Sequence, residues 1–250
     1  MFRVFPPSGR TDVSVFMTAV TDLELSEVPL ANADEVATFV TAKRRREHLA
    51  GRWLLGQALV SMGHRDLSCI EVLRDEHRAP SLAYIQGVWK REPLPSISVG
   101  HSDGSAVVAL SDASLAIGID VEPMGRSLAA NAFDMMSKGE ELAWVKDHPD
   151  ASMRLWTSKE AVQKAMGLGM HLNPRDIRIP IGNSEAKIAI GKSIIQLEHW
   201  FEYEFQFALA VTGASPSAST AEDRLLEETR VRMQAQPDWG VGCKTQRNNA

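Results

Sequence analysis

Apolar and polar residues alternate regularly enough to predict most elements in the first half of the chain. Residues 11–20 alternate with a period of two, which predicts a strand. Residues 32–62 carry apolar side chains three and four positions apart, which predicts one long helix in which Gly51 marks a break or a close packing contact. Residues 95–112 predict two strands joined by an Asp-Gly turn, a strong hairpin signal.

A similar series follows in the second half. Residues 114–123 predict a strand, residues 131–148 and 151–169 predict helices, and residues 177–213 predict three or four antiparallel strands. Strands and a long helix therefore occur twice. We expect an α+β fold of two similar halves related by a pseudo-two-fold axis, each with a long helix packed on a small, mostly antiparallel sheet.

These patterns also predict the organisation of the chain. Residues 1–112 form the expected N-terminal half and residues 113–213 the C-terminal half. Residues 214–250 begin as a linker of small residues, continue with a capping-box signal at Ser219 and Glu222 that predicts a helix, and end in a segment expected to be disordered.

Composition and charge narrow the class of protein. The chain has 250 residues, 44% of them hydrophobic and 24% charged, as in soluble globular proteins. A net charge of −5 argues against general binding of nucleic acid. Cys69 and Cys243 predict neither a disulfide framework nor a zinc cluster. Without a signal peptide pattern or a long apolar run, we expect a cytoplasmic protein with no membrane partner.

The stretch from 115 to 122 places two acids beside a run of aliphatic residues. Alternation puts Asp120 and Glu122 on one face of the predicted strand, together with Ala116 and Gly118, and the aliphatic residues on the other. Residues two apart in a strand are roughly 6.5–7 Å apart, so both acids can approach one cation. From this stretch alone, an exposed face with two solvated acids is the favoured interpretation.

Charged residues elsewhere have ordinary explanations when each is taken separately. Glu160 and Lys164 lie four apart on one predicted helix face, where a surface ion pair is the alternative to a partly buried carboxylate that needs a counter-charge or a metal. His101 precedes the Asp-Gly turn, where histidines are usually structural or solvated. The basic run 43–47, together with Arg52, is typical of a solvated helix face.

Two motifs in combination carry more information. The order GHS, GIDVE and WTSKEAVQKAMGLG resembles the 4′-phosphopantetheinyl transferases, specifically the larger, pseudo-dimeric type that activates carrier proteins. The last five positions of the strand motif (V/I)GID(V/I)E are Gly118 to Glu122, and the helix motif WxxKEAxxKAxGxG spans residues 156–169 with every fixed position filled. The resemblance covers roughly residues 10–213.

The resemblance implies a reaction and its participants. Coenzyme A is the implied co-substrate, a serine of an apo acyl or peptidyl carrier protein the acceptor, and adenosine 3′,5′-bisphosphate the leaving group. Mg²⁺, for which Mn²⁺ can substitute, is the implied metal, with Asp120, Glu122 and Glu160 as its ligands. Glu160 is the implied base for the serine proton, and Lys164 stabilises phosphate oxygens.

The residues expected to contact coenzyme A match the family pattern less completely than the metal ligands do. The resemblance assigns contacts with coenzyme A to six residues. Asp120 and Lys164 are two of them, and the residues implied to face its phosphates are Lys43, Arg74, Arg78 and His101. Ala79 stands where the family often has a lysine before the proline, and Gly100 where it commonly has a serine before the histidine. Both departures affect expected coenzyme A contacts and leave the metal ligands complete.

Partner contacts and other functions remain as alternatives. Met135, Met136 and Lys138 are candidates for contact with the carrier protein, although the methionines can equally belong to the core. The two-half layout makes a monomer the expected state. A Mg²⁺-dependent phosphohydrolase and a non-catalytic coenzyme A or carrier-binding homologue are the alternatives, and the complete set of acids argues against the second.

Overall fold

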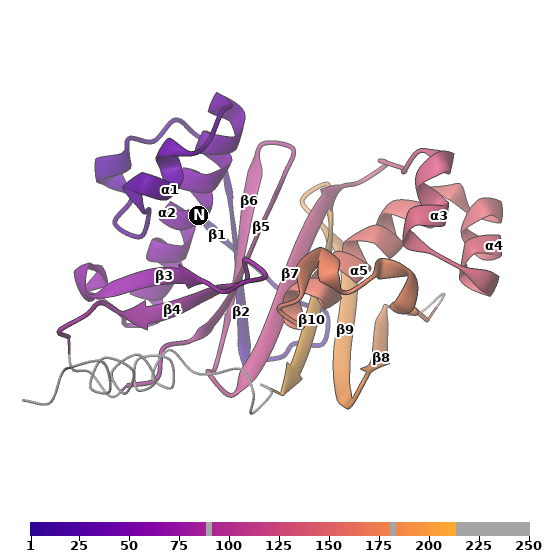
Figure 1. Cartoon of the computed structure of the whole chain (residues 1–250). Coiled ribbons are helices and arrows are strands. Elements are labelled where there is room, and N and C mark those ends of the chain that lie inside the picture. The colour runs from indigo at the N-terminus through magenta and orange to yellow at the C-terminus, as the bar shows by residue number, and fades with distance from the viewer. Residues whose placement is uncertain (89–91, 181–183, 214–250) are drawn as a thin grey trace, which may run out of the picture. The chain divides into compact units, whose positions relative to one another are not determined.

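Two four-stranded antiparallel sheets, each covered by a long helix, form the fold (Figure 1). This confirms the predicted α+β class. The computed structural model describes residues 1–88, 92–180 and 184–213. The predicted linker and helix after residue 213, and Cys243, lie outside the described residues. Within these ranges, no helix is both long and apolar enough to span a membrane.

The predicted hairpin supplies two neighbouring strands of the N-terminal sheet. Asp103 and Gly104 both have positive φ, 45° and 73°, as the tight turn between its strands requires. The strands lie in the spatial order β1 (Phe2–Val4), β2 (Val13–Ala19), β6 (Ser105–Ser111) and β5 (Ser96–Ser102). A separate hairpin consists of β3 (Ile70–Arg74) and β4 (Pro80–Tyr84).

The prediction of one helix over residues 32–62 is wrong. The structure has α1 (Ala33–Ala37) and α2 (Ala42–Ser61), because each has its own N-cap. The Asn32 side chain accepts from two backbone amides of α1, and the Thr41 hydroxyl accepts from Arg44 N at 3.2 Å. A Cβ on Gly51 would lie 3.1 Å from Val99 Cγ1, so this glycine marks close packing of α2 on β5.

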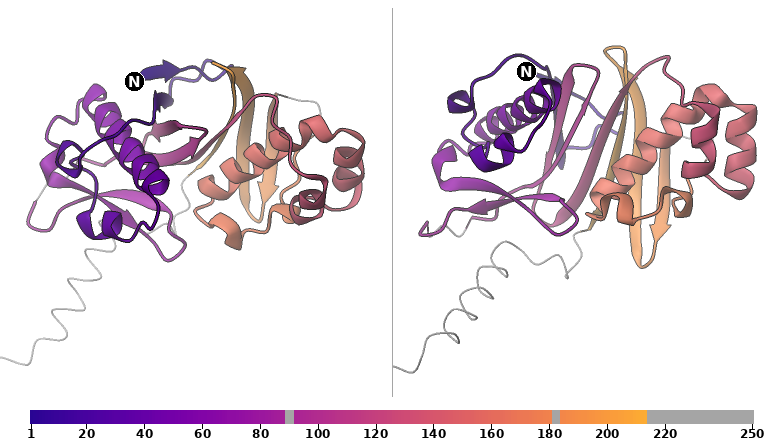
Figure 2. Two further views of the ribbon diagram at one scale, coloured as in Figure 1. Left: turned by 90° about the horizontal axis from the view of Figure 1, so that it is seen from above. Right: turned by 45° about the horizontal axis from the view of Figure 1, so that its top comes forward.

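The C-terminal half repeats the arrangement. Its strands lie in the order β7 (Leu115–Pro123), β10 (Phe205–Gly213), β9 (Ser193–Glu202) and β8 (Glu185–Ile190). The remaining helices are α3 (Phe133–Met136), α4 (Gly139–Asp147) and α5 (Ser152–Ala165). Figure 2 shows α5 crossing this sheet as α2 crosses the first. Short 3₁₀ turns lie at Leu25–Glu27, Leu67–Cys69, Ala130–Ala132, Pro149–Ala151, Gly169–His171 and Pro174–Asp176.

One expectation for this half is wrong, because the predicted helix over 131–148 is broken between α3 and α4. The described part of 177–213 contains three strands, which confirms the prediction of three or four. Met136 is fully buried in the core beneath α5, which confirms the core alternative for this residue. Met135 is 70% exposed and remains a candidate contact.

One apolar cluster joins the two sheets and explains the alternation in β7. Ile117, Ile119 and Val121 project into it, as the period of two predicts. The other members come from both sheets: Val4, Val13, Val15, Met17, Val107, Ala109, Trp200, Phe207, Leu209 and Val211. The opposite face of β7, which carries the two acids, therefore points toward α5.

A buried histidine in β9 predicts a loss of stability in acid. His199 is 5% exposed, and burial together with nearby Arg154 lowers its pKa from 6.5 to about 4. At pH values between about 4 and 6.5, His199 therefore binds a proton in the unfolded chain but not in the folded chain. We expect the free energy of unfolding to fall by about 3 kcal/mol as the pH drops from 6.5 to 4.

Urea unfolding at a series of pH values measures this dependence. His199→Gln should make the fall between pH 4 and 6.5 shallower, leaving the contribution of His48, whose pKa burial also lowers to about 4. His64→Gln should leave the curve as in the original chain. If the free energy of unfolding falls with pH equally in His199→Gln and in the original chain, groups other than His199 cause the sensitivity to acid.

Candidate functional site

The acids of β7 lie at the seam where β5 of the other half meets this strand. Ile119 N donates to Ser98 Oγ at 3.0 Å, and Ser102 Oγ donates to Glu122 Oε2 at 2.7 Å. Gly100 lies between these contacts. A Cβ on Gly100 would lie 3.3 Å from both Ile119 O and Lys164 Nζ, so the serine expected there from the resemblance would lack room.

Gly118 lets α5 rest directly on β7. A Cβ at this position would lie 1.9 Å from Ala161 O and 2.5 Å from Ala165 N, both backbone atoms of α5. Only glycine permits this approach. The contact fixes Glu160 and Lys164, on the same helix, over the acidic face of the strand.

Lys164 and Asp120 form a close ion pair. Lys164 Nζ donates to Asp120 Oδ1 at 2.7 Å and to Ile119 O at 3.0 Å. Although burial opposes it, the carboxylates of Asp120 and Glu160 raise the pKa of Lys164, which is therefore charged. Asp120 is 4% exposed, so the interpretation of two solvated acids is wrong. The reason is the cover that α5 provides.

Glu160 completes a group of three neighbouring carboxyl groups. Burial raises its pKa from 4.5 to about 7, and the negative charges of Asp120 and Glu122 add to this, offset in part by Lys164. When protonated, Glu160 donates a hydrogen bond to Asp120. Burial also raises the pKa of Glu122, despite the hydrogen bond from Ser102. The cluster thus sets three carboxyl groups against two neighbouring cations, Lys164 and Arg126, whose Nη1 lies 3.3 Å from Glu122 Oε2.

The side chains of Asp120, Glu122 and Glu160 offer carboxylate oxygens, which are suitable ligands for a divalent cation. Asp120 Oδ2 is buried and receives no hydrogen bond from the described residues. Carboxylate oxygens are the ligands that Mg²⁺ prefers, and a cation would relieve the repulsion that raises the pKa of Glu160. Over the described ranges, no three acidic, His or Cys side chains enclose a point closely enough to hold a metal ion. Asp120 and Glu122 are instead turned toward protein donors, Lys164 and Ser102.

His101, predicted as a phosphate contact, lies in a small charged group beside the seam. Its Nε2 contacts Arg44 Nη1 directly and lies 3.4 Å from Glu47 Oε2. Burial, reinforced by Arg44, lowers the pKa of His101, so the ring is neutral at neutral pH. Lys43 Nζ lies 3.8 Å from Glu47 Oε1, and its side chain is 77% exposed. The sequence did not distinguish Arg44 from its basic neighbours.

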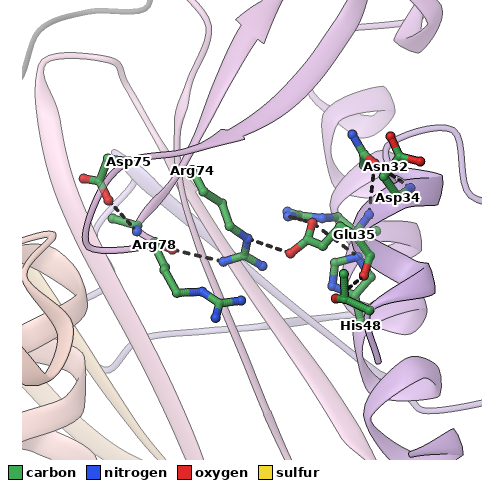
Figure 3. Close-up of polar contacts among 10 residues, drawn as sticks. Asn32, Asp34, Glu35, His48, Arg74, Asp75 and Arg78 are labelled. Carbon is green, nitrogen blue, oxygen red and sulfur yellow. Dashed lines mark hydrogen bonds and ion pairs between the residues drawn. The ribbon is translucent and has the colours of Figure 1, made fainter. Parts of the chain in front are cut away.

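Arg74 and Arg78 come from the same turn, between β3 and β4 (Figure 3). Arg74 donates to Glu35 Oε1 at 2.7 Å and to Arg78 O at 3.0 Å. Arg78 has a φ of 66°, and the turn is held by the Asp75 carboxylate, which accepts from His77 N and Ala79 N. The Arg78 side chain lies alongside that of Arg74 in Figure 3.

Arg52 is a site residue that the sequence did not reveal. It is 4% exposed, so its assignment to a solvated helix face is wrong. Its Nη2 lies 3.6 Å from Glu35 Oε2, while Nε and Nη2 have no hydrogen-bond partner among the described residues. Burial, with the charge of Arg74, lowers its pKa to about 10. A buried guanidinium with free donors, next to a second arginine, favours an anionic ligand.

A comparison with known protein families matches the part of the chain that contains the three acids. Residues 116–213 match the sequence model of the 4′-phosphopantetheinyl transferase superfamily. The matched segment contains Asp120, Glu122, Glu160 and Lys164. The basic residues near α2 and in the β3–β4 turn lie outside it. No curated protein sequence matches the chain.

Proposed function

We propose, from the premise that this chain belongs to the 4′-phosphopantetheinyl transferase superfamily, that it transfers the 4′-phosphopantetheine of coenzyme A to a serine of an apo acyl or peptidyl carrier protein. The observation that carries the proposal is the cluster of three carboxyl groups with one lysine at the seam. Mg²⁺, or Mn²⁺ in its place, would be held by Asp120, Glu122 and Glu160 and would neutralise the diphosphate when bound.

The reaction exchanges one phosphorus–oxygen bond for another. The serine oxygen attacks the phosphorus that bears pantetheine, and the bond to adenosine 3′,5′-bisphosphate breaks. The serine loses its proton to a base. Glu160 suits this role because a carboxyl group with a pKa of about 7 accepts a proton efficiently near neutral pH.

Cations of the chain would hold the phosphate groups. Lys164 is the nearest to the three acids and would stabilise phosphate oxygens during transfer. Arg52, with buried donors free, and Arg74 beside it would bind a phosphate of the nucleotide. Arg78 and the group of His101 and Lys43 would supply further contacts, and the neutral His101 ring can donate one hydrogen bond.

The acceptor is proposed from the family alone, with one candidate surface. Met135 is exposed, and Lys138 pairs with Asp176 on the outside of the C-terminal half. An apolar and a basic side chain together suit an acidic helix with apolar residues, as expected of a carrier protein. We further propose that the chain acts as a monomer in the cytoplasm.

Mass measurement of carrier proteins tests the function. The chain is incubated with coenzyme A, Mg²⁺ and a panel of apo acyl and peptidyl carrier proteins, and each carrier is weighed by mass spectrometry. We expect a gain of one phosphopantetheine on serine, abolished by EDTA. Hydrolysis of coenzyme A without a mass gain would instead identify a phosphohydrolase, and binding without turnover a non-catalytic homologue.

A further inference from the structure

Lys159 is a fully buried charge whose bonds are all made inside the C-terminal half. It lies on α5, is 0% exposed and is among the largest fully buried side chains. Its Nζ donates to Glu141 Oε2 at 2.6 Å, Pro174 O at 2.9 Å and Ile177 O at 2.6 Å. An ammonium group has three protons to donate, so this one is satisfied and has none left for a ligand.

These bonds fasten two other segments to α5. Glu141 belongs to α4, and its second oxygen, Oε1, accepts from Ile179 N at 3.1 Å. Pro174 and Ile177 belong to the segment that leads from α5 toward β8. Lys159 and Glu141 therefore tie α4 and this segment to one turn of α5. That turn also carries Glu160.

The same helix is held on its other side by β7. Gly118 allows the α5 backbone at Ala161 to lie against the strand, as described above. Contacts from two directions, at Lys159 and at Ala161, leave α5 little freedom to rotate about its axis. Rotation would carry the Glu160 carboxyl away from Asp120, whose charge adds to the effect of burial in raising the pKa of Glu160.

We propose that Lys159 is a positioning residue for the transfer reaction: by clamping α5 to Glu141 and to the carbonyls of Pro174 and Ile177, it sets the place of the Glu160 carboxyl over Asp120. This rests on the proposed function of the acid cluster. Lys159 does not touch the substrate. Its main effect is on the rate of the chemical step, because Arg52 and Arg74, which would bind a phosphate of the nucleotide, lie in the other half.

A pair of variants separates positioning from simple stabilisation. Lys159→Met leaves Glu141 and two carbonyls buried without a donor, so it lowers the midpoint of thermal unfolding. Lys159→Met with Glu141→Gln removes both charges and keeps an oxygen that accepts from Ile179 N, so we expect a midpoint within about 4 °C of the original chain. We expect this double variant to lose about 10²-fold in kcat, as for a small misplacement of a catalytic group, with the KM for coenzyme A changed less than about threefold.

Lys146→Met on α4 is the matched control, because this lysine is exposed and pairs only weakly, with Asp134 at 3.6 Å. It should retain the original kcat. A double variant that regains stability and also the original kcat would overturn the proposal.

A crystal structure of the double variant gives a readout that does not depend on turnover. The proposal requires the Glu160 carboxyl to be displaced from Asp120. An unchanged position would overturn it even if the transferase function holds, whereas an inactive original chain with a displaced Glu160 in the variant would contradict the function and leave the positioning intact.

Discussion

Glu160→Gln will lower the rate of phosphopantetheine transfer by about 10²–10⁴-fold, the usual contribution of a general base. Glutamine keeps the shape of the side chain but cannot accept the serine proton. It also removes a titrating carboxyl group whose pKa is raised to about 7 by burial and then by the charges of Asp120 and Glu122. Because Glu160 is only half-buried, the fold should persist.

The rate is measured by the mass gain of an apo carrier protein over time, with circular dichroism as the check on folding. Glu140→Gln is the control, since Glu140 is an exposed acid on α4 away from the seam. If Glu160→Gln transfers phosphopantetheine at the original rate, the proton must leave by another route and the assignment of the base is wrong.

Gly118→Ala will destabilise the protein by about 3 kcal/mol, at the upper end of the usual cost of overpacking. The added methyl group would lie 1.9 Å from Ala161 O, and backbone atoms cannot move aside as a flexible side chain can. Since α5 must shift away from β7, Glu160 and Lys164 move with it. Transfer should therefore fall together with stability.

Urea unfolding of Gly118→Ala and Gly213→Ala provides the comparison. Gly213 is in the same sheet, paired with Leu115, and a Cβ there meets no atom within 4 Å. It should change the free energy of unfolding by less than about 1 kcal/mol. Equal stability of the two variants would show that α5 does not rest on β7 as described.

Alternation in the sequence located the longer strands, but it did not reveal β1 or the β3–β4 hairpin, nor the ends of the helices. β7 and the β5–β6 hairpin lie where the period of two and the Asp-Gly turn predict them. The helix over 32–62 was predicted as continuous because apolar spacing continues across the break. The caps at Asn32 and Thr41, which divide it, are hydrogen bonds of single side chains and leave little trace in periodicity.

The candidate site, too, could be predicted from the sequence only in part. Asp120, Glu122 and Glu160 could be grouped from motifs in the sequence, but their burial could not, because it depends on the approach of α5 at Gly118. Arg52 was missed because a basic residue in a basic helix is ordinarily solvated. Its burial places it beside Glu35 of α1, which also pairs with Arg74 at the end of β3, a contact between distant parts of the sequence.

Binding of Mn²⁺, followed by electron paramagnetic resonance in the presence of coenzyme A, tests the central claim most directly. The claim is that the three carboxyl groups at the seam together hold one divalent ion on the diphosphate. We predict one bound Mn²⁺ per chain, displaced by Mg²⁺ and lost in Asp120→Asn. Binding that is absent from the original chain, or unchanged in Asp120→Asn, would contradict the claim.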